Sequence, residues 1–371
     1  MKTKAAIVYE FNKPVIVEEI DLRPPRESEL MIKIAASGIC HSDYSVMTGT
    51  IPHDLPEVLG HEGAGTVVEV GPNTEGYQVG DRVMLPFVSS CGKCSRCTSG
   101  HPTLCEVHFA GKRGMLIDGT FRFHKGDQDI YQFSRIGALS EYTVVHTNSV
   151  VPLPDGYTFE HGALLGCGVT TGVGAVTRTA QVPAGSTVAI IGCGGVGLNV
   201  IQGARLAAAS TIIAVDQMPS KLDQAKQFGA THCVNSKDRD AVEAVKELTQ
   251  GNGVQFAFEA IGLPLTIELA YNMLSVGGNA VIIGITGFRD TITIPAAFLP
   301  IWEKKITGSF FGSCLPSEDM PYLLSLYKQK KLMLDELISK YYELEEINQA
   351  FSDMEVGENI RGMVLFEKEG D

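Results

Sequence analysis

The chain has 371 residues, of which 44% are hydrophobic and 20% are charged, so it is long enough for two domains and too apolar for general disorder. Its formal net charge of −13 opposes binding to nucleic acid or to anionic lipid, and no Lys/Arg cluster reverses that charge locally. No apolar run reaches bilayer length, and residues 1–4 lead directly into a strand-like pattern without a signal peptide. We therefore expect a cytoplasmic protein with no membrane or nucleic-acid partner, in which disulfides do not explain the nine cysteines.

Short β runs separated by Pro and Gly turns fill the first part of the chain. They cover residues 5–9, 15–20, 29–35, 66–70 and 81–85. This pattern predicts a compact, mostly antiparallel domain whose loops present functional side chains.

Two fragments in these loops carry metal-binding side chains. The first is Cys40-His41-Ser42-Asp43, and the second is Gly60-His61-Glu62-Gly63-Ala64-Gly65. A cysteine near histidines in an intracellular protein indicates a metal ligand or a nucleophile. Either fragment alone is equally compatible with a buried thiol, an exposed histidine and a glycine-rich turn. We interpret the small residues around His61 as leaving room for a metal and a cofactor.

Four further cysteines lie within one short polar segment. Cys91, Cys94, Cys97 and Cys105 have the spacing C-x2-C-x2-C-x7-C. Four thiolates complete a tetrahedral Zn²⁺ site with no open position, which is typical of structural zinc. An iron–sulfur cluster is the alternative, but the spacing matches neither ferredoxin pattern. The segment 91–105 therefore predicts a structural zinc lobe.

The chain from residue 111 to residue 137 is polar and glycine-rich, and we expect it to be irregular. Strand-like runs follow at 140–145 and 150–152. Gly166-Cys167-Gly168 then presents a lone thiol whose role the spacing leaves open, as it does for Cys193, Cys233 and Cys314.

A dinucleotide-binding pattern begins with the apolar run at 186–191. Gly192-Cys193-Gly194-Gly195-Val196-Gly197 comes next, then a helical stretch at 198–208, a strand at 211–215 and Asp216. The glycines let the backbone approach a pyrophosphate at the helix N-terminus, and Asp216 can accept hydrogen bonds from the ribose hydroxyls. The same carboxylate would repel a 2′-phosphate, so NAD is favoured over NADP.

Alternating helices and strands continue to about residue 310. Helices are predicted at 220–228, 239–249 and 263–274, and strands at 232–234, 254–259, 279–285 and 305–310. These elements complete a six-stranded, doubly wound parallel sheet. The last segment holds helices at 319–330 and 344–354 and a strand at 363–366, and we expect it to return to the first domain.

With these motifs in this order, the sequence resembles the zinc-dependent alcohol dehydrogenases of the medium-chain dehydrogenase/reductase family over nearly its whole length. The resemblance implies a mostly β, GroES-like catalytic domain (1–168 and 312–371) with a Rossmann domain (169–311) inserted in it, and an active site in the cleft between them. It also implies a homodimer or a homotetramer, with two zinc ions and NAD in each subunit. The expected substrate is a small alcohol or aldehyde.

The resemblance implies a role for each motif residue. Cys40, His61 and Cys167 match the catalytic zinc ligands, and Cys91, Cys94, Cys97 and Cys105 match the structural zinc ligands. Glu62 is similar to a carboxylate close behind the metal, Asp43 to the residue that orients His61, and Ser42 to the first hydroxyl of a proton relay. Cofactor contacts are implied for His41, Thr171, Gly192, Gly194, Gly195, Val196, Gly197, Asp216, Lys221, Ile285 and Arg361.

Phe87, Phe109 and Phe310 fall at or near positions that line the substrate pocket in this family, with Ile285 beside them. They predict an apolar, partly aromatic pocket for primary aromatic or medium-chain alcohols. Ordinary core positions are the competing interpretation for each residue.

The chain departs from its relatives at two positions. Many relatives end the proton relay at a histidine where this chain has Ser45, so proton release is expected to pass through a ribose hydroxyl and water. Glutathione-dependent formaldehyde dehydrogenases carry a carboxylate-binding arginine where this chain has Phe109, although Arg113 lies nearby. A nicotinoprotein that keeps its NAD permanently bound is a further alternative. A binding protein without chemistry is disfavoured by the complete ligand set.

Overall fold

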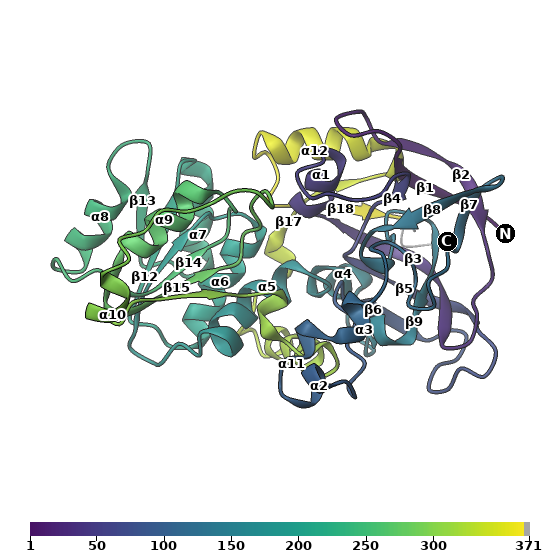
Figure 1. Cartoon of the computed structure of the whole chain (residues 1–371), viewed down its shortest axis with the longest axis horizontal. Helices are drawn as coiled ribbons and strands as arrows, with labels where there is room; N and C mark the ends of the chain where they lie inside the picture. Colours follow the sequence, from purple (N-terminus) through teal and green to yellow (C-terminus); the bar gives the residue numbers. More distant parts are fainter. Residues whose placement is uncertain (367–371) are drawn as a thin grey trace. The chain divides into compact units, whose positions relative to one another are not determined.

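The computed structural model describes residues 1–366, which form two compact units. Residues 1–167, 315–330 and 334–366 make the first unit, and residues 168–314 with 331–333 make the second. A β-rich unit is thus interrupted by a parallel α/β unit (Figure 1). The predicted fold class is confirmed.

The first unit contains a closed barrel of five strands. In barrel order the strands are β1 (Lys2–Val8), β2 (Ile16–Leu22), β7 (Phe123–Lys125), β8 (Gln128–Gln132) and β4 (Glu57–Val58). Its interior is apolar, with Ile7, Ile20, Phe123 and Ile130 in one buried cluster.

The hairpin of β7 and β8 corrects the expectation that residues 111–137 are irregular. Lys125 pairs with Gln128 across a two-residue turn, Gly126-Asp127, in which Gly126 has a φ of 59°. A Gly-Asp pair between short apolar runs is a hairpin signal. Arg122, just before β7, is fully buried and donates from Nε and Nη2 to the Glu29 carboxylate at 2.8 and 2.6 Å. This bidentate pair joins the hairpin to the neighbouring sheet.

The second sheet of the first unit positions several predicted site residues. Its order is β10 (Val151–Pro152), β6 (Arg82–Leu85), β5 (Gly63–Val70), β3 (Glu29–Ile39), β18 (Arg361–Leu365) and β17 (Ile338–Tyr342), with β9 (Tyr142–His146) also paired to β3. In this register Gly362 lies opposite Ile39, and Gly63 lies opposite Ser37. Arg361, Cys40 and Glu62 therefore meet where these strands begin or end.

The helices of the first unit pack against this sheet and its loops. They are α1 (His41–Met47), α2 (Ser95–Thr98), α3 (Glu106–Phe109), α4 (Phe159–Leu165), α11 (Pro316–Lys328) and α12 (Ile347–Glu355). One buried core joins Val46 of α1 to Ile347 and Phe351 of α12, so the two ends of the chain share a single core.

The second unit is built on a six-stranded parallel sheet. Its order is β13 (His232–Asn235), β12 (Thr211–Asp216), β11 (Thr187–Ile191), β14 (Val254–Glu259), β15 (Leu274–Ile282) and β16 (Lys305–Gly308). Its helices are α5 (Gly168–Gly174), α6 (Gly195–Leu206), α7 (Pro219–Phe228), α8 (Ala241–Leu248), α9 (Pro264–Asn272) and α10 (Phe298–Ile301). Residues of α8 and α9 cover one face of the sheet, and right-handed crossovers place α6 and α7 on the other.

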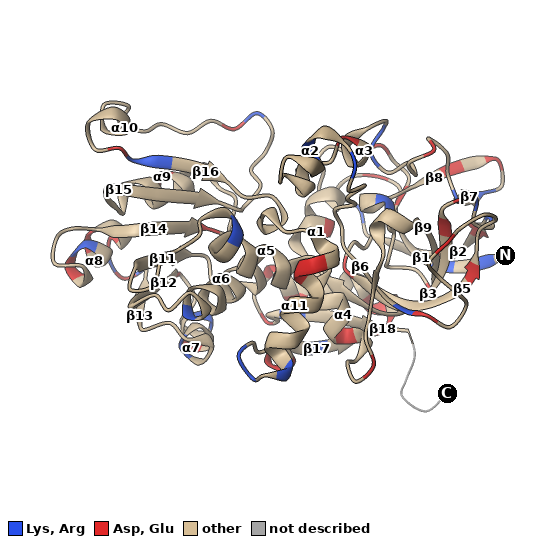
Figure 2. Cartoon of the chain, turned by 90° about the horizontal axis from the view of Figure 1, so that it is seen from below, with Lys and Arg blue, Asp and Glu red and all other residues tan. Residues whose placement is uncertain are grey.

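Single-turn helices complete the described chain. They are η1 (Pro102–Leu104), η2 (Phe133–Arg135), η3 (Thr147–Ser149), η4 (Ala175–Thr179), η5 (Phe311–Ser313), η6 (Asp335–Leu337) and η7 (Leu344–Glu346). Within residues 1–366, no helix combines the length and apolar character that a bilayer span requires. Lys and Arg are scattered over many elements in Figure 2 instead of gathering on one of them.

We predict that the buried ion pair contributes strongly to stability. Glu29→Gln leaves the buried Arg122 guanidinium without its carboxylate, which costs about 3 kcal/mol for pairs of this kind. The measurement is urea unfolding of the metal-loaded protein. Asp118→Asn is the matched control, because Asp118 contacts the same guanidinium at 3.0 Å but is more than a third exposed. Equal losses in the two variants would contradict this account.

Candidate metal centres and cofactor site

The four-cysteine lobe brings its predicted ligands together. The Sγ atoms of Cys91, Cys94, Cys97 and Cys105 all lie within 4.8 Å of one another. Sγ–Sγ distances of 4.0 Å (Cys91 to Cys97) and 3.9 Å (Cys94 to Cys105) are close to the spacing of about 3.8 Å that four Zn–S bonds of about 2.3 Å impose in a tetrahedron. All nine cysteines are free thiols.

The electrostatics of this lobe favour a bound cation. Backbone N–H groups of Cys97 and Glu106 lower the pKa of Cys94 to about 6. Burial and the neighbouring Cys94 side chain instead raise the pKa of Cys97 to about 12. One thiolate thus disfavours ionisation of the next cysteine unless a cation offsets the negative charge. Four cysteine ligands suit Zn²⁺.

A second cluster unites residues that are far apart in the sequence. Cys40 follows β3, His61 and Glu62 lie between β4 and β5, and Cys167 follows α4. Their ligand atoms all lie within 4.8 Å of one another, and all four residues are buried. The chain therefore holds two candidate zinc sites.

The orientation of His61 suits a metal ligand. Its Nδ1 lies 3.1 Å from Oδ2 of Asp43, whose Oδ1 accepts a hydrogen bond from the Gly60 N–H at 2.8 Å. Neither ring nitrogen has a hydrogen-bond partner among the described residues, but Nδ1 has the Asp43 carboxylate beside it, whereas Nε2 is 3.9 Å from Oε1 of Glu62. An orphaned ring nitrogen beside two thiols is the arrangement expected when a metal is its partner.

Charges around the cluster attract a cation. The Cys167 side chain is the main cause that holds the pKa of Cys40 well below its usual range. Burial would lower the pKa of His61, but the neighbouring Asp43 and Cys40 outweigh it and raise that pKa to about 10.

Glu62 lies between the cluster and Arg361. Its Oε1 is 3.9 Å from Nε2 of His61, and its Oε2 forms an ion pair with Nη2 of Arg361. A buried carboxylate requires such compensation. Arg361 thus neutralises Glu62 on the side away from His61.

The glycines around His61 serve backbone packing. Gly60 has a φ of 97°, and a Cβ there would lie 2.1 Å from the Leu139 nitrogen. A Cβ on Gly65 would lie 2.0 Å from the Lys33 carbonyl oxygen. Our interpretation that these glycines leave room for metal and cofactor is therefore wrong, because neighbouring backbone fills that space.

The predicted cofactor loop has the backbone of a dinucleotide site. Gly192 has a φ of 92°, and a Cβ on Gly197 would lie 1.8 Å from the Gly192 oxygen. Gly194 caps α6, and a Cβ there would meet no atom within 4 Å. The loop therefore leaves open space in front of the N-terminus of α6, beside Gly195 and Val196, where a pyrophosphate would bind.

Other predicted cofactor residues lie around this loop. Asp216 ends β12, and its carboxylate accepts hydrogen bonds from the Cys193 and Met218 N–H groups at 2.8 and 2.9 Å. Lys221 lies on α7, and Thr171 lies on α5 with a buried Oγ1 that has no described partner. Ile285 follows β15, and exposed His41 begins α1 in the first unit.

Two phenyl rings pack edge-on against His61. Phe87, predicted from the sequence, has its ring centroid 5.7 Å from that of His61, at an interplanar angle of 89°. Phe133, which the sequence analysis missed, is closer, at 4.9 Å and 71°. His53 packs on Phe133 at 5.2 Å, and its Nδ1 lies 2.9 Å from Oε2 of the buried Glu57. If Gly126-Asp127 had been recognised as a hairpin turn, the sequence would have predicted a strand that ends just before Phe133.

The other two predicted pocket residues lie on separate elements. Phe109 ends α3 of the four-cysteine lobe and packs on His108, with ring centroids 4.9 Å apart. Phe310 precedes η5 in the second unit.

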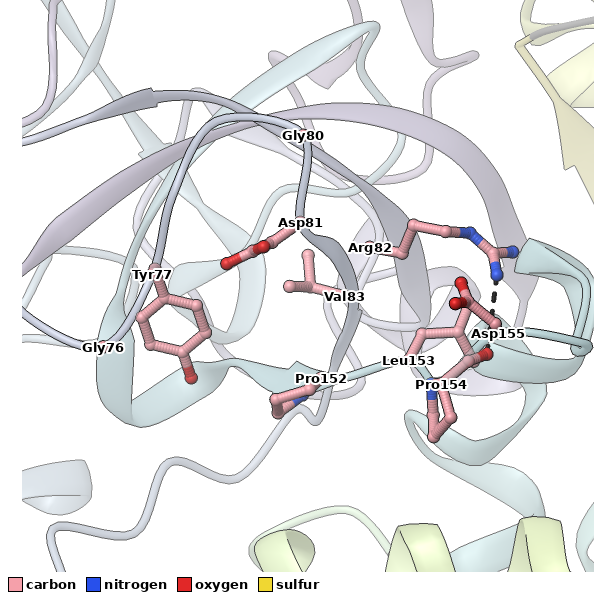
Figure 3. A pocket seen from close by; sticks show the side chains of 10 residues that line it. All are labelled: Gly76, Tyr77, Gly80, Asp81, Arg82, Val83, Pro152, Leu153, Pro154 and Asp155. Atoms are coloured by element: carbon pink, nitrogen blue, oxygen red, sulfur yellow. Dashed lines mark hydrogen bonds between the residues drawn. The ribbon is translucent and has the colours of Figure 1, made fainter.

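A groove of about 370 Å³ elsewhere in the first unit carries none of these residues (Figure 3). It is lined by residues 76–77, 80–83 and 152–155. Its polar side chains are satisfied locally, since Arg82 donates to the Tyr157 carbonyl at 2.6 Å and Tyr77 donates to that of Val150 at 3.1 Å. We assign no ligand to it.

Family models match both units. The alcohol dehydrogenase GroES-like domain matches residues 26–155, and the zinc-binding dehydrogenase model matches residues 195–329. Together with the two clusters, these matches show that the chain belongs to the zinc-dependent alcohol dehydrogenases of the medium-chain dehydrogenase/reductase family.

Individual relatives agree over their whole length. Alcohol dehydrogenase B of Mycobacterium tuberculosis is 41% identical over 371 residues, covering 99% of each chain. S-(hydroxymethyl)glutathione dehydrogenase of Synechocystis is also 41% identical, covering 99% of this chain and 100% of that protein. The NDMA-dependent alcohol dehydrogenase of Amycolatopsis methanolica is 38% identical, with coverage of 98% and 99%.

A solved structure is similar over the same span. Benzyl alcohol dehydrogenase of Acinetobacter calcoaceticus has a TM-score of 0.92 and 33% identity, covering 99% of this chain and 100% of that one. The names of these relatives differ in the substrate or in the electron acceptor.

We predict that the two clusters bind metal independently. Cys167→Ala removes one thiol from the buried cluster and leaves the four-cysteine lobe intact. Zinc measured by mass spectrometry after desalting should fall from about two ions per chain to about one. Cys233→Ser, at a lone half-buried thiol, is the control and should keep both ions. Retention of both ions by Cys167→Ala would contradict the assignment.

Proposed function

We propose that this protein interconverts a primary alcohol and its aldehyde, with NAD as the hydride acceptor. The observation that carries the proposal is the buried group Cys40, His61 and Cys167, in which the His61 Nε2 has no hydrogen-bond partner among the described residues. Two thiols and one imidazole would hold zinc and leave a fourth position for the substrate oxygen.

The aromatic rings beside His61 support an apolar substrate. Phe87 and Phe133 pack edge-on against the imidazole, so the walls next to the proposed open position are phenyl groups. Such walls favour aromatic or medium-chain primary alcohols. Phe109 and Phe310 are proposed to line the rest of the pocket.

The residues around the cluster divide the chemical work. When bound, zinc supplies a Lewis acid that lowers the pKa of an alcohol oxygen, and NAD supplies the acceptor for hydride. Asp43 orients His61 through Nδ1, and the burial of the cluster excludes bulk water. Ser42, whose Oγ lies 3.8 Å from Sγ of Cys40, is placed to take the first proton. Ser45 offers no imidazole beyond it, so a ribose hydroxyl of the cofactor and water would complete proton release.

We assign the preference for NAD over NADP to Asp216. A carboxylate at the end of β12 accepts hydrogen bonds from ribose hydroxyls and repels the 2′-phosphate of NADP. His41, Lys221 and Arg361 are proposed as the cationic contacts of the cofactor, with Thr171 and Ile285 beside it.

Two alternative functions have specific support. The Amycolatopsis relative is an NDMA-dependent enzyme, which favours comparison with a nicotinoprotein. The Synechocystis relative acts on S-(hydroxymethyl)glutathione, and Arg113 of this chain is the candidate for a glutathione carboxylate.

A substrate and acceptor panel tests the proposal. The purified holoenzyme is assayed with benzyl alcohol, hexanol, ethanol and S-(hydroxymethyl)glutathione, each with NAD, NADP or NDMA. We expect kcat/KM to be highest for benzyl alcohol or hexanol, and at least about fivefold higher with NAD than with NADP, because close like charges cost about 1 kcal/mol or more. Asp216→Gly is expected to reduce that preference.

Each contrary result identifies an alternative. Preference for S-(hydroxymethyl)glutathione indicates the glutathione-dependent reaction. Turnover with NDMA alone, by protein that retains NAD after desalting, indicates a nicotinoprotein. Full activity after removal of the buried metal would contradict the proposed mechanism.

We further infer a homodimer, with a homotetramer as the larger assembly. β16 lies at an edge of the six-stranded sheet, where unpaired backbone groups invite pairing with another strand. Ile301, just before β16, and Val276, on the neighbouring β15, are 70% and 72% exposed. Light scattering should give about twice or four times the chain mass of 39.9 kDa, and a monomer would contradict the inference.

We also infer a cytoplasmic location. All nine cysteines are free, and eight of them lie in the two metal clusters or at other buried positions, where oxidation would disrupt metal binding or packing. Such thiols persist in a reducing compartment.

A further inference from the structure

The phenyl ring of Phe133 is the aromatic wall closest to His61. Its centroid lies 4.9 Å from that of the imidazole, against 5.7 Å for Phe87, and the side chain is buried. Phe133 also belongs to the buried core that contains Val46 and Phe351. Under the proposed function we take its ring as one wall of the substrate pocket beside His61.

Phe133 begins a turn with an unfavourable backbone. Ser134 and Arg135 follow it with φ angles of 54° and 61°, so two consecutive residues with side chains occupy the left-handed region. Residues other than glycine rarely adopt this conformation, and it persists only where surrounding contacts hold it. The turn itself contributes N–H bonds from Ile136 and Gly137 to the Phe133 carbonyl.

The side chain of Arg135 connects the turn to residues outside it. Its buried guanidinium donates from Nη1 to the Val107 carbonyl at 2.9 Å and from Nη2 to the Ala110 carbonyl. Both acceptors belong to α3 and its cap, which directly follow the zinc-lobe ligand Cys105. One planar side chain thus ties the Phe133 turn to the four-cysteine lobe.

The charge of Arg135 also fits this lobe. Within residues 1–366, Arg135 forms no ion pair with a carboxylate, and its hydrogen bonds go to backbone carbonyls. Burial lowers the pKa of Arg135, and Cys105 opposes that effect. Four thiolates around one divalent ion keep a net negative charge, which a buried guanidinium offsets.

We propose that Arg135 is a positioning residue that holds Phe133 against His61 by fastening the turn at residues 133–135 to the four-cysteine lobe. The lobe then has a role in substrate selection as well as in stability. This inference rests on the proposed alcohol dehydrogenase function. It assigns the width of the pocket to a residue that does not touch the substrate.

The test separates pocket width from general stability. Arg135→Ala should lower the ratio of kcat/KM for benzyl alcohol to that for ethanol by about tenfold, since hydrophobic pocket contacts discriminate by about this much. Phe133→Leu should lower the ratio similarly. If Arg135 acts through Phe133, adding Arg135→Ala to Phe133→Leu should change the ratio little further. Additive effects, or equal losses for both alcohols, would overturn the proposal.

Two further variants serve as a control and as a substitute for Arg135→Ala. Arg96→Ala removes an exposed guanidinium from α2 of the same lobe and should leave the ratio unchanged. If Arg135→Ala does not fold, Arg135→Lys serves instead, because an ammonium cannot span both carbonyls as the guanidinium does. An unchanged ratio in Arg135→Lys, or a shifted ratio in Arg96→Ala, counts against the proposal.

A readout without turnover distinguishes this proposal from the proposed function. A crystal structure of zinc-loaded Arg135→Ala should show the Phe133 ring displaced from His61, with the metal clusters intact. A ring that keeps its 4.9 Å separation overturns the positioning role even if the enzyme is active. If the native protein oxidises no alcohol, the proposed function fails, and the displacement alone decides the role of Arg135.

Discussion

The structure depends on burying ionisable side chains in a small volume where they cannot satisfy one another. Cys40, His61, Glu62 and Cys167 converge within 4.8 Å, and the His61 Nε2 has no described hydrogen-bond partner. Such an arrangement is unfavourable in an empty protein interior and favourable around a cation. The architecture of the first unit follows from that requirement, because three separate segments, which carry Cys40, His61-Glu62 and Cys167, must meet at one point.

Charged and polar groups around this cluster offset the charges of its side chains. The Asp43 carboxylate lies beside Nδ1 of His61 and accepts a hydrogen bond from the Gly60 N–H. Arg361 neutralises the side of Glu62 that faces away from His61. The four-cysteine lobe repeats the pattern, with backbone N–H groups and Arg135 around its thiols. In both places a bound metal would be one of several charged groups whose charges offset one another.

Local motifs could be predicted from the sequence, whereas contacts between distant segments could not. The G-x-G-x-x-G loop and the C-x2-C-x2-C segment carry their geometry in their own spacing, and the six-stranded sheet follows from its alternating pattern. Phe133 and Arg135 escaped prediction because their roles arise from what the barrel hairpin places next to them. The glycines near His61 were misread for the same reason, since the backbone that they contact comes from Lys33 and Leu139.

The pairing of β18 with β3 has a consequence for synthesis on the ribosome. Gly362 pairs with Ile39, and the core of the first unit contains both Val46 and Phe351, so this unit needs both ends of the chain. The second unit is nearly continuous, from residue 168 to residue 314 with a short later segment, and most of it emerges earlier. The proposed metal ligands Cys40 and His61 are therefore translated first but enclosed last. Until the final strand emerges, these thiol and imidazole groups remain open to metal exchange and oxidation, and chain termination just before β18 would leave them permanently in that state.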